Sequence, residues 1–229
     1  MARQLFELYG TDPARVFSPF CWRSRMALAH KGLDFDSVPW RFTEAARLAF
    51  ANYDKVPVLV DGDAVVVDSF AIAKHLDAAY PDAPSLMHGN AEPYAFIGAW
   101  TDTVLHAGVA GLVVSDIPPL LDAADSAYFV QSREARFRKP LAEVTAGRED
   151  RLPAFRASLL PLRHALRGRD FLGGAAPDYA DYTVFGGFMW ARSVSPLPLL
   201  EADDIIHAWR ERMLDLHGGM ARRAPCFGA

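Results

Sequence analysis

The sequence divides into a first third, in which strand and helix patterns alternate, and a remainder that follows helical spacing. Runs of β-branched and aromatic residues predict strands, while alanine-rich amphipathic runs predict helices. The predicted strands are 6–9, 35–38, 56–60 and 64–67, and the predicted helices are 19–31, 43–51 and 69–80. Asp61-Gly62 is a hairpin signal between the last two strands. The order βαβ and then αββα predicts a small mixed sheet with helices on its faces, and therefore an α/β unit.

A break in this pattern divides the chain into two predicted domains. Prolines and glycines interrupt residues 81–91, which we interpret as a linker between domains at 1–80 and 92–229. Beyond the linker, apolar residues recur at helical spacing, which predicts an all-helical domain. The recurring positions are Ile97, Trp100 and Val104, then Leu152, Phe155, Leu159, Leu162 and Leu166, and finally Ile206, Trp209, Met213 and Leu216. Pro161 should kink the second of these runs, and the pattern of residues 118–150 does not decide between helix and loop.

Charge and cysteine content narrow the function classes. The formal net charge of −4 gives no basic character that would indicate nucleic acid binding. No apolar run approaches the length of a membrane span, and the N-terminus lacks an apolar signal region, so we expect no membrane partner. Cys21 and Cys226 are too few for a disulfide framework, which favours a cytoplasmic protein. The seven histidines are scattered without metal-ligand spacing, and we expect no metal.

One stretch, 133–169, is locally basic. It contains ten Lys or Arg residues against four Asp or Glu residues. The interpretation favoured by base rates is a solvated face on two helices. The functional interpretation is a rim that attracts an anionic cofactor or substrate.

The start of the first predicted helix carries the residues with the most chemistry. Ser18 occupies an N-cap position and Pro19 the first helical position. A hydroxyl and the Cys21 thiol therefore lie at the positive end of a helix, which favours an anion such as a thiolate. On these residues alone, we favour the structural interpretation, with Ser18 as a helix cap and Cys21 as a small apolar filler.

Four motifs together resemble the cytosolic glutathione transferases. They are Ser18-Pro19-Phe20-Cys21-Trp22-Arg23, Lys55-Val56-Pro57, Asp68-Ser69, and the capping-box pair Asp178 and Asp181. The first resembles the active-site helix of the serine- and cysteine-type classes, whose first residue is catalytic. The resemblance implies a thioredoxin-like glutathione-binding domain followed by an all-helical domain. It also implies glutathione as co-substrate, a homodimer, and an aromatic or otherwise apolar small-molecule electrophile as the second substrate.

The resemblance also implies roles for individual residues. Ser18 would stabilise the glutathione thiolate, with Phe20 beside it in the glutathione site. The Val56 backbone would pair with the cysteinyl part of glutathione after a cis peptide at Pro57. Asp68 and Ser69 would hold the γ-glutamyl group. Lys55 would reach the glycyl carboxylate, and Arg41 is a weaker alternative for that role.

Several alternatives stay open at this point. Tyr9 at the end of the first strand is a rival for the catalytic hydroxyl, and Cys21 would serve a thiol-disulfide reductase. A non-catalytic glutathione-fold binding protein is a third hypothesis. Segments 148–153, 171–174 and 180–182 resemble the bacterial glutathione-dependent β-aryl etherases and their fungal-type relatives. From helical position alone, we expect Trp100, Leu105 and Met189 to line the electrophile site.

Overall fold

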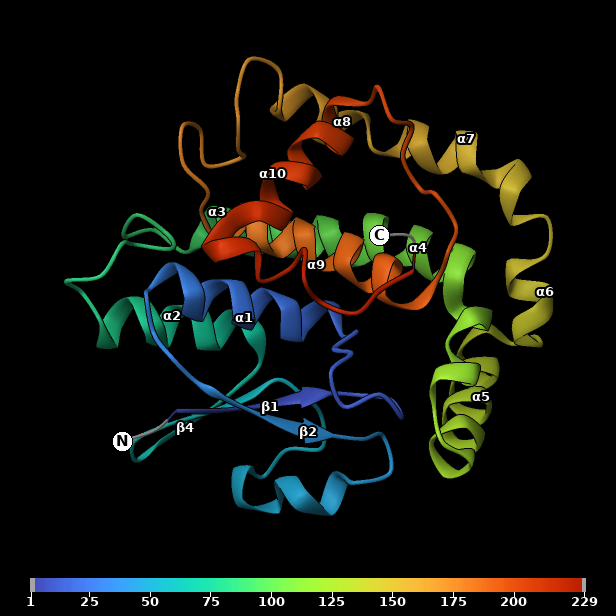
Figure 1. Cartoon of the computed structure of the whole chain (residues 1–229), viewed down its shortest axis with the longest axis horizontal. Helices are drawn as coiled ribbons and strands as arrows, with labels where there is room; N and C mark the ends of the chain where they lie inside the picture. The colour runs from blue at the N-terminus through green and yellow to red at the C-terminus, as the bar shows by residue number, and fades with distance from the viewer. Residues whose placement is uncertain (1–2, 228–229) are drawn as a thin grey trace.

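The computed structural model describes residues 3–227, and its first part is a four-stranded mixed sheet (Figure 1). The strands are β1 (Gln4–Leu8), β2 (Asp36–Trp40), β3 (Val58–Asp61) and β4 (Ala64–Val67), in the spatial order β2-β1-β3-β4. β1 pairs with β2 in parallel and with β3 antiparallel, and β3 and β4 form an antiparallel hairpin. The predicted mixed sheet is confirmed.

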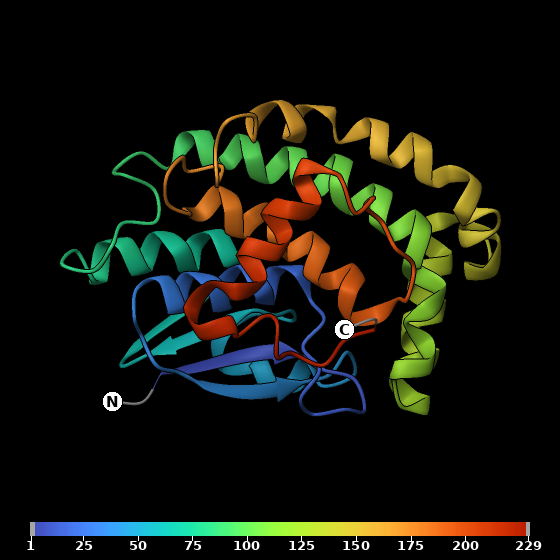
Figure 2. The same cartoon turned by 45° about the horizontal axis from the view of Figure 1, so that its top comes forward.

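Helices cover both faces of this sheet. α1 (Pro19–His30) and α2 (Ser69–Ala79) lie on the face turned toward the rest of the chain (Figures 1 and 2). The predicted helix at 43–51 is present as a 3-10 helix, η1 (Ala45–Ala51), on the opposite face. The sheet face under α1 is buried, and its residues Leu5 and Leu59 are fully inaccessible to solvent.

The second part of the chain is helical, as predicted. Its elements are α3 (Glu92–Trp100), the π-helical turn η2 (Thr101–Leu105), α4 (His106–Val113), the 3-10 turns η3 (Val114–Asp116) and η4 (Pro118–Leu120), α5 (Ala123–Phe137), α6 (Leu141–Thr145), α7 (Arg148–Ser158), α8 (Leu160–Ala165), α9 (Tyr179–Val194) and α10 (Ile205–Gly219). α9 is buried along nearly its whole length and packs against α1. This contact joins the helical part to the sheet part.

Three sequence expectations for the helices need refinement. Residues 118–150, which the pattern left undecided, form mainly α5 and α6. The run at 152–166 is two helices, α7 and α8, and Pro161 lies in the first turn of α8, where proline removes no helical hydrogen bond. α10 leaves helical geometry at Leu216, which the apolar pattern had included.

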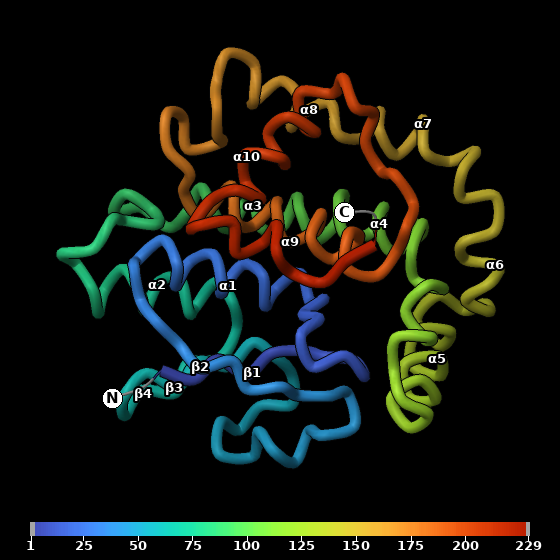
Figure 3. Tube along the Cα trace, in the orientation of Figure 1, coloured from blue at the N-terminus to red at the C-terminus, as the bar shows by residue number. Residues whose placement is uncertain are grey.

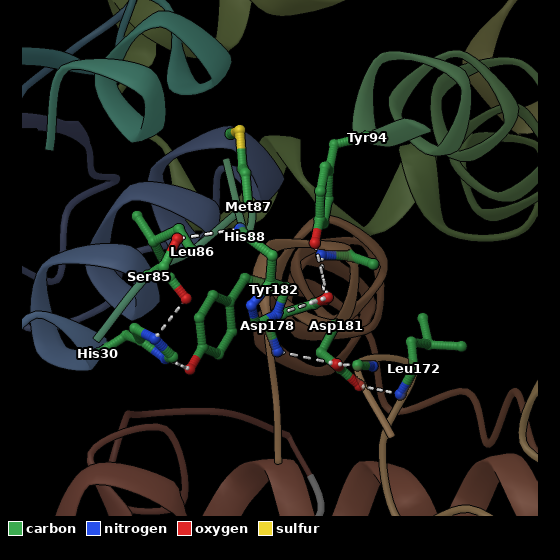
Figure 4. Close-up of polar contacts among 12 residues, drawn as sticks. His30, Ser85, Leu86, Met87, His88, Tyr94, Leu172, Asp178, Asp181 and Tyr182 are labelled. Atoms are coloured by element: carbon green, nitrogen blue, oxygen red, sulfur yellow. Dashed lines mark hydrogen bonds and ion pairs between the residues drawn. The ribbon is translucent and has the colours of Figure 1, made fainter. Parts of the chain in front are cut away.

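The start of α9 is fixed by the predicted capping box, which is confirmed (Figure 4). The Asp178 backbone N–H donates to the Asp181 carboxylate at 3.1 Å, and the Leu172 N–H donates to the same carboxylate at 2.7 Å. Figure 4 also shows the Tyr182 hydroxyl directed at His30, whose Nδ1 lies 2.7 Å away. Because His30 is on α1, this hydrogen bond ties α1 to α9.

The expectation that no apolar run approaches the length of a membrane span was wrong. The continuous helical segment Glu92–Asp116 has 25 residues and a window of mean hydropathy 1.3, so by length and composition it is able to cross a membrane. In the structure, 39% of that window is buried, and α3 and α4 pack against α9. Core helices of globular proteins meet the same criteria, so this segment is weak evidence for a membrane span.

Candidate functional site

A cavity of about 600 Å³ lies beside the start of α1, between it and helices α4 and α5. Ser18 and Phe20 form one wall, and Lys55 and Val56, just before β3, form a second. The remaining walls come from α4, α5 and Trp190 of α9. Most of the lining is apolar or aromatic, as expected for a site that binds a small organic molecule.

Ser18 has a hydroxyl proton available toward this cavity. Its side chain is 5% exposed, and its Oγ accepts the Cys21 backbone N–H at 3.3 Å. Within residues 3–227 the hydroxyl has no other oxygen or nitrogen partner, and its one further polar neighbour is the Cys21 thiol, a weak acceptor that a thiolate placed in the cavity would outcompete. A free hydroxyl donor at the positive end of a helix stabilises an anion placed against it.

Cys21 is not brought to the cavity. Its side chain is fully buried, and burial, together with the nearby Glu7 carboxylate, raises the pKa of its thiol to about 12. The reactive form of cysteine is the thiolate, and a buried thiol with such a pKa is inert at neutral pH. The helix start therefore favours a thiolate from outside the chain over one at Cys21.

Tyr9 belongs to a buried polar network that lies outside the cavity wall. Its hydroxyl is 2.7 Å from Ser37 Oγ and accepts from Arg25 Nη2 at 3.1 Å. Arg25 also forms a bidentate pair with Glu7, at 2.7 and 2.8 Å. Burial raises the pKa of Glu7 despite this pair. These contacts occupy the Tyr9 hydroxyl and give it a structural explanation.

The Lys55-Val56-Pro57 motif has the backbone form that its resemblance implies. The peptide bond between Val56 and Pro57 is cis. Lys55 is exposed, lines the cavity, and pairs with no acidic side chain among residues 3–227. Arg41, the alternative to Lys55, is instead paired with Asp122 at 2.6 Å and is absent from the cavity wall.

Asp68 and Ser69 lie beside that motif, since the Asp68 N–H donates to the Pro57 carbonyl at 3.3 Å. Asp68 caps α2: its Oδ1 accepts from the Phe70 and Ala71 N–H groups at 2.8 and 3.1 Å. Asp68 adopts a φ of +74°, a strained conformation for a non-glycine residue that often marks a functional position. The Ser69 hydroxyl is buried and has no hydrogen-bond partner in the described chain.

The structure does not bring the three expected electrophile-site residues to the cavity. Leu105 and Met189 are fully buried in the core, and Trp100 is partly buried away from the wall. For Leu105 the reason is the π-helical turn η2 that contains it, whose i to i+5 spacing shifts the helical register. Trp100 precedes this turn and Met189 lies on α9, so the turn does not explain their positions. His106 and Trp190, the sequence neighbours of Leu105 and Met189, face the cavity instead.

His106 belongs to a polar cluster that the sequence analysis missed. Its Nδ1 lies 3.2 Å from Asp102 Oδ1, and Arg23 Nη2 donates to the same oxygen at 2.7 Å. Burial raises the pKa of Asp102, but the hydrogen bond from His106 and the charge of Arg23 outweigh it and hold that pKa below its usual value. Burial also lowers the pKa of His106. The i, i+4 pair of Asp102 and His106 in an otherwise apolar helix was the available signal.

The α5 wall was missed because residues 118–150 could not be assigned. α5 contributes Tyr128, Phe129 and Arg133 to the cavity, where they pack against Phe42. α5 lies alongside the loop after β2, where the Thr43 N–H donates to Asp125 at 2.9 Å (Figures 2 and 3). Among residues 3–227, no group of three or more His, Cys, Asp or Glu side chains converges in a way that could hold a metal ion.

Comparison with known proteins identifies the family. Residues 17–79 match the model of the glutathione S-transferase N-terminal domain, and residues 93–220 match that of the C-terminal domain. The chain therefore belongs to the glutathione S-transferase family.

The relatives include fungal and plant proteins. The glutathione S-transferase-like protein ustS of Aspergillus flavus is 29% identical over 170 residues, which cover 69% of this chain and 57% of that protein. Glutathione S-transferase Z1 of Arabidopsis thaliana is 40% identical over 89 residues, which cover 34% of this chain and 39% of that protein. The matched region thus spans about half or less of these curated relatives.

Solved structures match over nearly the whole chain. Glutathione transferase GSTFuA3 from Phanerochaete chrysosporium has a TM-score of 0.76 and 26% identity, covering 97% of this chain and 94% of that one. The glutathione S-transferase CsGST63524 of Ceriporiopsis subvermispora, solved in complex with glutathione, has a TM-score of 0.82 and 22% identity, covering 96% and 98%. These matches confirm the predicted fold.

Proposed function

We propose that this chain is a serine-type glutathione transferase, in which Ser18 activates the glutathione thiol for attack on an electrophilic or aryl-ether-bearing small molecule. The observation that carries the proposal is the Ser18 hydroxyl at the wall of the cavity: its oxygen accepts the Cys21 N–H, and no oxygen or nitrogen acceptor of the described chain competes for its proton. A hydrogen bond to the thiolate favours the charged sulfur over the thiol and so raises the fraction of nucleophile at neutral pH.

Glutathione itself would occupy the sheet domain, which we place at 1–80, with the linker at 81–91 and the helical domain at 92–229. Among residues 3–227 the backbone groups of Val56 enter no strand pairing, so they are available to an extended peptide. In this proposal Lys55 holds the glycyl carboxylate, while Asp68 and the start of α2 hold the γ-glutamyl group. Phe20 packs beside the sulfur. We drop Arg41 from the site, because Asp122 occupies it.

The second substrate would enter the cavity from the side of α4 and α5. Its aromatic lining suits an aryl compound, and a phenolate would be the leaving group in a β-etherase-like reaction. We also propose a homodimer in the cytoplasm, because two-fold dimers are the commonest oligomers of soluble proteins. A glutathione-dependent reductase using Cys21 gains no support from its buried, high-pKa thiol.

Two measurements test the proposal. Calorimetry should detect glutathione binding, and glutathione consumption should be measured against β-aryl ethers, haloarenes and disulfides. Conjugation or ether cleavage is the expected result. Binding without turnover of any compound would favour a non-catalytic binding protein. A folded protein that gives no heat with millimolar glutathione would end the transferase proposal.

A further inference from the structure

Arg133 is a partly buried cation at the cavity wall that lacks an acidic partner. Its guanidinium carbon lies 4.8 Å from the Phe129 ring centroid and 5.5 Å from that of Phe42. Its Nη1 donates to Ser132 Oγ at 2.9 Å. Within residues 3–227, no carboxylate lies within 4 Å of this guanidinium. The head group is therefore held in place by aromatic stacking and keeps most of its donors free.

This arginine differs from others in the same basic stretch. Arg148 pairs with Asp116 at 2.6 Å, and Arg163 pairs with Asp204 at 2.6 Å. Those contacts fasten α7 and α8 to the rest of the helical domain. Within the basic stretch, Arg148 and Arg163 therefore have a structural role, whereas Arg133 and its neighbour Arg136 line the cavity.

A partly buried cation without a counter-ion loses some of its hydration without compensation, so its position favours an anion beside it. Burial lowers the pKa of Arg133, but a guanidinium starts so far above neutrality that it stays charged at pH 7. Its planar fork matches a carboxylate in two parallel hydrogen bonds. The aromatic side chains beside it, Phe42, Tyr128 and Phe129, offer a surface for a ring attached to that carboxylate.

Near Asp102, by contrast, the charges along the cavity wall are already paired. Asp102 lines the wall on η2, and Arg23 and His106 hold it ionised while both contact its Oδ1. An anionic group therefore finds an uncompensated cation at Arg133 and none at the paired Asp102 and Arg23. A substrate with a carboxylate at one end would thus present its neutral end toward Asp102 and away from α5.

We propose that the second substrate is an aromatic compound bearing a carboxylate, bound by Arg133 against the Phe42 and Phe129 wall. This inference rests on the proposed function in that it names the substrate class of the same site. Glutathione also carries carboxylates, so the experiment must show whether Arg133 binds a carboxylate of glutathione or the carboxylate of the second substrate.

Binding of unreactive probes tests the inference without turnover. Calorimetry should compare 3-nitrobenzoate with its methyl ester, with and without saturating glutathione, on the parent, Arg133→Gln and Lys139→Gln. Lys139 is an exposed cation just beyond the end of α5 and away from the cavity wall, so it is a matched control for charge. The parent and Lys139→Gln should bind the acid at least about tenfold more tightly than the ester, and Arg133→Gln should abolish the difference. Arg133→Lys, which keeps the charge but loses the fork, should give an intermediate value.

Three results would overturn the inference. The first is a parent that binds the acid and the ester equally, and the second is an Arg133→Gln variant that still prefers the acid. The third is an Arg133→Gln variant with weaker glutathione binding and intact nitrobenzoate binding. The last result would assign Arg133 to glutathione.

Turnover separates this inference from the proposed function. The ratio of kcat/KM for 4-chloro-3-nitrobenzoate to that for its methyl ester should fall about tenfold in Arg133→Gln and stay unchanged in Lys139→Gln. If the parent turns over no electrophile, the transferase proposal fails, while the binding data still decide the inference. If the parent turns over both compounds but the ratio is unaffected by Arg133→Gln, the inference fails alone.

Discussion

Replacing Ser18 by alanine should lower the rate of glutathione conjugation, whereas replacing Cys21 by alanine should leave it within about twofold. A hydrogen bond to a charged sulfur contributes about 1.5–3 kcal/mol, so its loss corresponds to a rate lower by about one to two orders of magnitude. With a pKa of about 12, the Cys21 thiol at pH 7 is ionised in about one molecule in 100,000. A nucleophile so rarely formed, and buried outside the cavity, cannot sustain turnover.

The assay is the initial rate of conjugation at pH 7 with saturating electrophile. Ser24→Ala is the matched control, because the Ser24 hydroxyl is buried on the same helix and donates to the Phe20 carbonyl at 3.4 Å. Ser18→Ala also loses the cap of α1, which costs about 0.5–2 kcal/mol, so urea unfolding must show that the variant is folded at the assay temperature. The reasoning is refuted if Cys21→Ala abolishes turnover while Ser18→Ala retains it. Full activity in both variants would refute it too, and Tyr9 would then be tested.

Three further predictions concern packing, pH and assembly. Gly186→Ala should destabilise the fold by about 1–3 kcal/mol in urea unfolding, because the new Cβ would lie 2.4 Å from the Pro19 carbonyl oxygen. The control Gly98→Ala, whose new Cβ has nothing within 4 Å, should be neutral or stabilising. Equal effects of the two substitutions would contradict the argument. Burial and the nearby His30 lower the pKa of His217 to about 4. The unfolded chain therefore takes up that proton first, at about pH 6.5, so stability should fall as pH falls from there toward 4, and His217→Gln should flatten this slope; an unchanged slope refutes the assignment. Light scattering should give about twice the 25.2 kDa chain mass, and a particle of one chain mass at micromolar concentration would rule out the homodimer.

Features of both parts of the chain were predictable where their signals are local. The hairpin at Asp61-Gly62, the cap at Ser18 and the capping box at Asp178 each depend on residues a few positions apart, and the structure contains all three. Pro161 was interpreted as a kink within one helix, whereas it begins a new one. Proline signals a break in helical hydrogen bonding but does not say whether the chain bends or restarts.

The site was less predictable, since its walls come from distant segments. Helical spacing predicted that Leu105 would line the electrophile site, but the π-helical turn before α4 places His106 at the cavity instead. Spacing assumes an uninterrupted α-helix, and a π-turn leaves little trace in an apolar sequence. Arg133 was visible only as part of a basic stretch, because its role depends on which arginines find acidic partners in three dimensions.

The central claim is that Ser18 and the start of α1 stabilise the glutathione thiolate. The direct measurement is the pH titration of bound glutathione, followed by the ultraviolet absorbance of its thiolate, in the parent and in Ser18→Ala. Free glutathione, treated as cysteine-like, has a thiol pKa of about 8.5. The account predicts a lower pKa for glutathione bound to the parent, and a shift back toward higher pH in Ser18→Ala. Bound glutathione that titrates like free glutathione, or that titrates identically in both proteins, would contradict it.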